Sequence, residues 1–189
     1  MKKREETSLT KNREIKQRFT AGSIFQISID GNYYYGQMLE GYHIILFDYK
    51  SSNSLINLRE LKDKSVFFFG TVYPSVFSDG AWPKVGRLEI PDNYRTIPLQ
   101  WIHHDYRIGK SDEWEIYNSE TGAITPSSRQ ECIGLPPQGI YERSHIIDII
   151  ESHFRNEPCL WLWESYKYFP EIYGDSFERI KNKIDSSLW

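Results

Sequence analysis

Apolar residues recur in short runs along the first half of the chain, and turn-forming residues separate these runs. Residues 23–29 form one run, Asp30-Gly31-Asn32 follows as a turn, and residues 33–39 form a second run. A Gly-containing turn between two such runs predicts a β-hairpin. Two further runs, 43–49 and 64–73, have the apolar centres of buried strands. Successive strands with tight turns predict an antiparallel meander, or a small barrel.

The pattern changes in the second half, where helical periodicity follows further strands. Strands are predicted for Thr96–Ile102 and Asp112–Tyr117. In residues 142–154, four apolar side chains repeat on one helical face, and shorter helices are predicted at 159–169 and 175–184. The chain is therefore predicted to be a single α+β domain of mostly antiparallel sheet, with C-terminal helices packed on it.

The same pattern divides the chain into three segments. Residues 1–18 are charged and aperiodic, which predicts a flexible basic arm. Residues 19–155 carry the strands and the first long helix, and residues 156–189 form a helical extension. A short helix capped by Ser54 is expected between the third and fourth strands, and a loop with two adjacent prolines at 131–139.

The stretch Trp82-Pro83-Lys84-Val85-Gly86-Arg87-Leu88-Glu89-Ile90-Pro91 reads as a strand with proline at both ends. Glycine in the middle of a strand, here Gly86, indicates a bulge or a close approach of backbone. Trp82 has two interpretations, a core residue or an exposed contact for a partner.

The distribution of charge along the chain indicates which class of partner this protein favours. The chain has a net charge of −3, with 23 basic and 26 acidic residues. Residues 1–20 hold seven basic and three acidic residues, which leaves sixteen basic and 23 acidic residues, or −7, on the remainder. An acidic body disfavours nucleic acid and suits a basic protein partner, although an ordinary solvated surface has the same charge pattern.

Cysteine and histidine give little sign of chemistry. Cys132 and Cys159 lack metal-ligand spacing, and no segment has the length of a membrane span, so we expect a cytoplasmic protein without a membrane partner.

His103-His104-Asp105 is the one compact group of possible ligands. Neighbouring strand residues point to opposite faces, which disfavours a shared metal. No nucleophile or phosphate-binding motif is present, and we expect no catalysis and no cofactor.

Runs of aromatic residues raise the alternative of a small nucleic-acid-binding barrel. The runs are 33–35, 67–69 and 161–163. A stacking platform for bases needs an electropositive groove, which the acidic body does not favour. Core packing is the simpler interpretation, with exposed members such as Tyr34 or Trp114 left to anchor a protein partner. An enzyme with an unrecognised site is the second alternative.

Several short motifs in a fixed order resemble an immunity protein family, number twenty-six, that accompanies bacterial polymorphic toxins. These motifs are Gly22-Ser23-Ile24-Phe25-Gln26-Ile27, Gly31, Tyr35-Gly36, Phe47-Asp48-Tyr49, Trp82-Pro83-Lys84-Val85-Gly86 and Glu131-Cys132-Ile133-Gly134-Leu135. The resemblance covers residues 18–155. Ile27-Ser28-Ile29 departs from the Ile-Pro-Leu that the family tends to show, and the extension after Phe154 lies outside the family pattern.

The resemblance implies a protein that binds and neutralises a cognate toxin, with no reaction and no cofactor of its own. The acidic body adds the expectation of a basic nuclease whose active site or substrate path is occluded. Loops rich in acidic and aromatic residues are the predicted contact surface. The predicted contacts are Asp79, Trp82, Asp92, Tyr94, His103, His104, Asp105, Asp112, Glu113 and Trp114.

Overall fold

A computed structural model describes residues 17–55, 57–104 and 113–184. Its larger sheet has the strand order β5-β1-β2-β3-β4-β9. The strands are β1 (Ser23–Ile29), β2 (Asn32–Met38), β3 (His43–Ser51), β4 (Val66–Val72), β5 (Lys84–Arg87) and β9 (Ile140–Tyr141). All neighbours are antiparallel except β4 and β9. The predicted meander is confirmed as β1 to β4, and the described strands do not close into a barrel.

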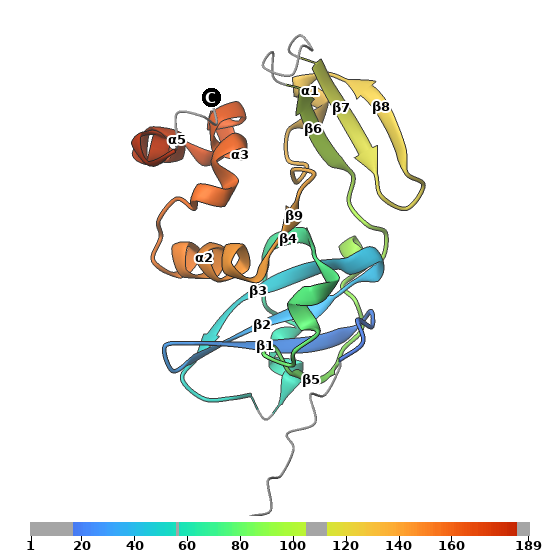
Figure 1. The fold of residues 1–189 in the computed structure, drawn as a ribbon, viewed down its shortest axis with the longest axis vertical. Coiled ribbons are helices and arrows are strands. Elements are labelled where there is room, and N and C mark those ends of the chain that lie inside the picture. The colour runs from blue at the N-terminus through green and yellow to red at the C-terminus, as the bar shows by residue number, and fades with distance from the viewer. Residues whose placement is uncertain (1–16, 56, 105–112, 185–189) are drawn as a thin grey trace, which may run out of the picture.

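A second, three-stranded sheet lies beyond the β4 edge of the first (Figure 1). Its order is β6-β7-β8, with β6 at Gln100–His104, β7 at Glu113–Asn118 and β8 at Ala123–Ser127. The C-terminal helices lie on the other side of the same view. The α-helices are α1 (Arg129–Cys132), α2 (Arg143–Phe154), α3 (Trp163–Tyr168), α4 (Pro170–Tyr173) and α5 (Ser176–Ile180). This arrangement confirms the α+β class with C-terminal helices.

Short 3-10 helices lie in several of the connections. They are η1 (Glu40–Tyr42), η2 (Leu58–Leu61), η3 (Pro74–Phe77), η4 (Asp92–Tyr94), η6 (Leu160–Leu162) and η7 (Lys181–Lys183). The helix predicted after Ser54 is η2, but its N-cap is Asn57, whose side chain accepts a hydrogen bond from the backbone N–H of Arg59 at 3.1 Å.

The β1–β2 hairpin forms where the sequence predicts it. Asp30 and Gly31 both have positive φ, 47° and 74°, and connect the pair Ile29–Asn32. Two consecutive positive φ values match the twist of adjacent antiparallel strands, and an Asp-Gly pair adopts them at low cost. This turn fixes which hairpin residues face each side of the sheet.

Both faces of the larger sheet are covered. On one face, Ile146, Ile149 and Ile150 of α2 are buried against a cluster that includes Phe68. Each such isoleucine contributes about 1.5–3 kcal/mol through burial. On the other face, η2 and residues 88–97 cover a second cluster that includes Phe69. The sheet is therefore the centre of the fold, and its β4 edge points toward the second sheet and the C-terminal helices (Figure 1).

The small sheet and the C-terminal helices share a third cluster. Phe169, between α3 and α4, packs with Trp101 of β6 and Trp114 of β7, at ring-centroid distances of 5.5 and 5.6 Å. Trp114 and Tyr34 are both buried, so the prediction that they remain exposed as partner anchors is wrong. Elements distant in sequence cover both rings: Tyr168 and Phe169 cover Trp114, and Phe154 packs on Tyr34.

The stretch at 82–91 contains a shorter strand than predicted, Lys84–Arg87. Of the two alternatives for Gly86, the bulge is present: Ile24 lies opposite Gly86 but Phe25 lies opposite Lys84, so the register shifts there. A Cβ at Gly86 would also collide with the Leu58 side chain. The loop predicted at 131–139 is preceded by a short helix, α1. Ser128 and Glu131 form a reciprocal capping box at its start, a Ser-x-x-Glu signal that was present in the sequence.

Candidate functional site

Two of the predicted contacts, Asp79 and Trp82, serve the packing of the larger sheet. The Asp79 carboxylate accepts two hydrogen bonds from the Arg143 guanidinium, both at 2.7 Å. This contact lowers the pKa of Asp79 to about 2. Trp82 is buried and stacks on Phe25, with ring centroids 5.8 Å apart and ring planes 10° from parallel. The core interpretation of Trp82 is therefore confirmed.

The predicted contacts Asp92 and Tyr94 lie on η4, beside the larger sheet. Asp92 is exposed and forms an ion pair with Arg95 at 3.0 Å. Tyr94 is half-buried and stacks over Phe69, with ring centroids 6.2 Å apart. Burial raises the pKa of the Tyr94 hydroxyl, which keeps it neutral.

The remaining described contacts belong to the small sheet. His104 and Glu115, on neighbouring strands, form a pair at 2.6 Å. The His103 ring lies 4.2 Å from Tyr168 and 4.5 Å from Trp114. Glu113 is exposed at the start of β7. The predicted contacts Asp105 and Asp112 lie outside the described residues. The eight described residues are thus divided between the surroundings of the two sheets, and whether any of the ten binds a partner stays a prediction.

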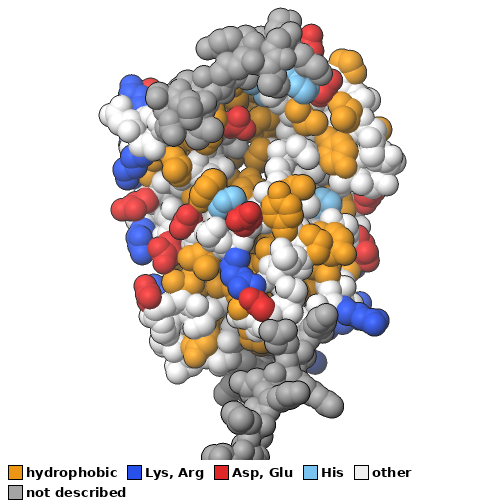
Figure 2. Space-filling view, in the orientation of Figure 1, with side chains coloured by type: hydrophobic (Ala, Val, Ile, Leu, Met, Phe, Trp, Pro, Cys, Tyr) orange, Lys and Arg blue, Asp and Glu red, His pale blue; other side chains and the backbone are white. Residues whose placement is uncertain are grey.

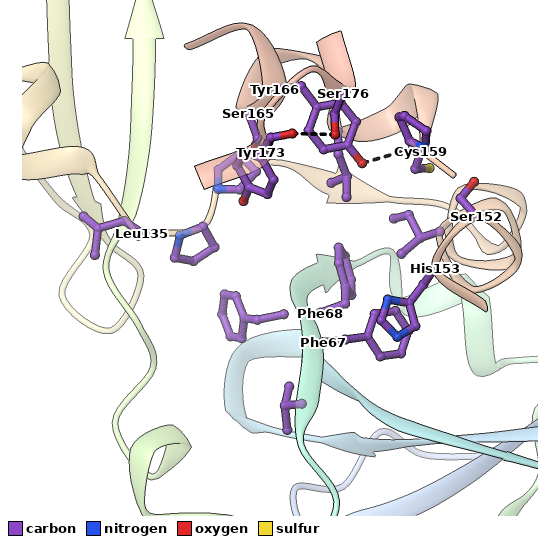
Figure 3. Close-up of a pocket in the computed structure, with 18 of the residues that line it drawn as sticks. Phe67, Phe68, Leu135, Ser152, His153, Cys159, Ser165, Tyr166, Tyr173 and Ser176 are labelled. Carbon is purple, nitrogen blue, oxygen red and sulfur yellow. Dashed lines mark hydrogen bonds between the residues drawn. The ribbon is translucent and has the colours of Figure 1, made fainter. Parts of the chain in front are cut away.

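A cleft that sequence reasoning missed lies between the two sheets and the C-terminal helices. Its volume is about 590 Å³. Four consecutive residues of β4, Val66 to Phe69, form its floor, while α2, α3, α5 and residues 134–137 contribute the walls (Figure 3). In the space-filling view, hydrophobic side chains surround a hollow in the upper half of the molecule (Figure 2).

Most polar groups that line the cleft are neutral. The Tyr166 hydroxyl accepts a hydrogen bond from the backbone N–H of Cys159 at 3.0 Å, and burial raises its pKa to about 12 (Figure 3). Burial also raises the pKa of the Tyr173 hydroxyl and of the Cys159 thiol. At neutral pH these three groups therefore carry no charge. They can hydrogen-bond a guest but cannot form an ion pair with it.

Ionisable side chains lie at the rim of the cleft. His153 stacks on Phe67 with ring centroids 3.8 Å apart, and its Nε2 lies 2.9 Å from an oxygen of Asp48. Glu157 and Arg179 line another part of the rim. The cleft therefore has an aromatic, neutral interior and a mixed-charge border, which suits an uncharged guest with polar flanks.

Two adjacent prolines explain why the cleft opens beside β4. β9 runs parallel to β4, with Thr71 opposite Ile140 and Val72 opposite Tyr141. A longer β9 would place Pro136 and Pro137 beside β4, where proline cannot donate to a ladder. Residues 136–138 instead follow β6: Trp101 N–H donates to the Pro136 carbonyl and Gln138 N–H to the Trp101 carbonyl. Residues 136–138 therefore pair with the second sheet, and the chain reaches the β4 edge only afterwards, at Ile140.

No group of three or more His, Cys, Asp or Glu side chains that could hold a metal occurs in the described parts of the chain. Within those same parts, no helix combines the length and apolarity that crossing a bilayer requires.

The fold and the cleft together define a small α+β protein with a developed binding cleft. The model of the Immunity protein 26 family matches residues 20–114, half of the chain, and the protein belongs to that family. The match is narrower than the predicted 18–155 and leaves out the motif at 131–135 and the C-terminal helices. No curated protein and no solved structure matches this chain. Membership supports a role in immunity to a toxin and implies a toxin as protein partner.

Proposed function

We propose that this protein binds a cognate polymorphic toxin and neutralises it by covering the toxin's active site or substrate path. Family membership is the observation that carries this proposal. An inhibitor of this kind needs an interface of about 1,600 Å², with a few well-buried contacts, to bind tightly. It needs no catalytic group.

The toxin that fits the charge of this protein is a basic nuclease. Residues 21–189 carry −7, and a nuclease must present a positive groove to the phosphates of its substrate. Opposite charges on the two proteins would speed their encounter and orient them. The carboxylate of Glu113 and that of Asp92, whose ion pair with Arg95 is itself exposed, would contribute to this attraction.

The proposed place of action is the bacterial cytoplasm. Cys132 and Cys159 are both buried as free thiols, and unpaired thiols are typical of a reducing compartment. Burial also raises the pKa of both thiols, so neither is a reactive thiolate at neutral pH.

Co-expression with the product of the upstream neighbouring reading frame tests the proposal. Growth arrest by that product alone, rescue by this protein, and co-purification at one to one are the expected results. Nuclease activity of the isolated neighbour should fall to zero at one equivalent of this protein. A harmless neighbour, or a toxic one that is not rescued, would contradict the assignment.

Charge reversal tests the predicted surface separately. Asp92→Lys with Glu113→Lys should slow association with the neighbour's product by about ten-fold at low salt. Glu40→Lys with Asp63→Lys changes two exposed carboxylates outside the predicted loops and the cleft by the same total charge, and this matched control should change association little. Equal effects of both changes would show that only net charge matters. Retained binding with no change in rate would place the contact elsewhere.

A further inference from the structure

One edge of the larger sheet is left without a strand neighbour. Among the described strands, β9 pairs with Thr71 and Val72 of β4 alone, so Val66–Gly70 has no strand on its outer side. Within the described residues, no backbone hydrogen bond joins Val66–Gly70 to any segment other than β3. Val66 to Phe69 line the cleft, so the outward N–H and C=O groups of these four residues face it.

This edge has the features that favour strand pairing. Its sequence, Val-Phe-Phe-Phe-Gly, contains no charge and no proline, which are the usual devices that protect an edge from other chains. It spans about 17 Å at the usual rise of a strand. Residues of η4, 134–137, α2 and α3 line the cleft around this edge, which favours a narrow, extended segment as the guest.

We infer that an extended segment of the toxin enters the cleft and adds to β4 as a further strand along Val66–Gly70. This inference rests on the proposed function and names the contact that would carry it. Backbone hydrogen bonds along the edge supply affinity in such complexes, and pockets for alternate side chains supply specificity.

The two walls define the chemistry of the guest. On the α2 side, alternate guest side chains would meet Ile149, Leu162 and the neutral Tyr166 hydroxyl. On the opposite side they would meet Tyr94 and Leu135 (Figure 3). Both walls are aromatic or aliphatic with neutral hydroxyls. The guest is therefore an uncharged segment of about five residues with apolar side chains that fit both walls.

Hydrogen exchange tests the inference directly, with the product of the upstream reading frame as the probe. In the free protein, the outward-facing amides among residues 66–70 should exchange quickly. In the complex, they should slow by at least about ten-fold. A complex that forms without protecting these amides would overturn strand addition and leave the proposed function intact. Absence of any complex would overturn both.

Two matched substitutions on one helix give a second test. Ser152 lines the cleft on α2, and Ser144 lies exposed on the same helix outside it. Ser152→Trp should fill the cleft and weaken toxin binding by about a hundred-fold, a change typical of a central contact. Ser144→Trp should leave affinity within about three-fold, as expected away from the interface.

Further measurements distinguish a misfolded variant from a blocked cleft, and a toxin segment from other segments that could occupy the β4 edge. Thermal unfolding identifies a misfolded Ser152→Trp protein, and Asn93→Trp then blocks the cleft from its opposite wall. Normal affinity in a folded cleft-filling variant would refute the inference. Protection of residues 66–70 in the free protein would refute it too. If that protection rises with concentration, a second copy occupies the edge; if it does not, the chain's own terminus does.

Discussion

Replacement of Trp82 by alanine should mainly destabilise the fold, with no separate effect on toxin binding. The side chain is 3% exposed and stacks on Phe25, while Phe77 meets it edge-on with ring centroids 5.8 Å apart. The Arg143 guanidinium lies 5.7 Å from the ring centroid. Trp82 is thus surrounded by groups of its own chain.

The magnitude follows from the area that is buried. A buried aromatic side chain removes about 200 Å² from water, worth about 5 kcal/mol at 25 cal/mol per Å². Measured losses for replacing a buried Phe or Trp by Ala are about 3–5 kcal/mol. We therefore expect Trp82→Ala to cost about 4 kcal/mol, a large part of the about 5–15 kcal/mol that stabilises a typical domain. Trp82→Phe keeps a ring and should lose about half as much.

Urea unfolding followed by far-UV circular dichroism measures the effect. The midpoint should fall while the m-value stays constant, and Tm should drop by about 10–15 °C. At 25 °C, folded Trp82→Phe should bind the toxin with unchanged affinity. A loss of stability below about 1 kcal/mol, combined with lost binding, would refute the packing argument. Trp82 would then be the exposed partner contact that the sequence left open.

Three further changes test separate parts of the fold, each through the urea midpoint. Gly36→Ala should cost about 1–3 kcal/mol, because its Cβ would collide with backbone and a buried ring, whereas Gly139→Ala has room and should be nearly neutral. Asp79→Asn should lower the midpoint at pH 7, and exposed Asp92→Asn should not. Because folding lowers the pKa of Asp79 from 3.8 to about 2, its contribution is complete above pH 3.8 and disappears as pH falls through 2, where variant and wild type should converge. Tyr166→Phe removes the acceptor of a buried backbone N–H and should cost about 1–3 kcal/mol; an unchanged midpoint would contradict that bond.

The meander could be predicted from sequence because its determinants are local. The Asp30-Gly31 pair dictates a tight turn, and apolar runs of strand length flank it. The helix α2 could be predicted in the same way, since apolar side chains from Ile146 to Phe154 repeat at helical spacing within its twelve residues. An element can be predicted from sequence where a single segment contains both the apolar periodicity of the element and the turn residues that end it.

Burial of single aromatic residues could not be predicted in the same way. Alternation along a strand says that Trp114 and Ile116 share a face, but it does not say which distant element covers that face. Tyr168 and Phe169 cover Trp114 from more than fifty positions away. The sequence shows that Asp79 carries a charge, but it does not show that Arg143, 64 positions away, forms two hydrogen bonds with it. Trp114 and Asp79 were predicted to contact a partner, but contacts with residues distant in the sequence place both in the packing of the protein itself.

The cleft is the clearest case of a site that one segment does not determine. Its floor is β4, and it stays open because the segment with Pro136 and Pro137 pairs with Trp101 before the chain reaches β4 at Ile140. The prolines were visible in the sequence as a loop signal. Their effect on β4 depends on the parallel pairing of Thr71 with Ile140, a long-range contact that local patterns do not contain.

Charge and backbone pairing would act at different stages of the proposed inhibition. The net charge of −7 on residues 21–189 attracts a basic toxin over a distance, and salt screens this attraction. It therefore governs how often the toxin arrives in the right orientation. The β4 edge acts only after contact, through hydrogen bonds and an aromatic interior that salt screens little. Discrimination among toxins of similar charge then depends on the cleft. A segment with a charge at its centre would lose its hydration there and find no counter-ion among the neutral hydroxyls of Tyr166 and Tyr173, so the cleft would exclude it.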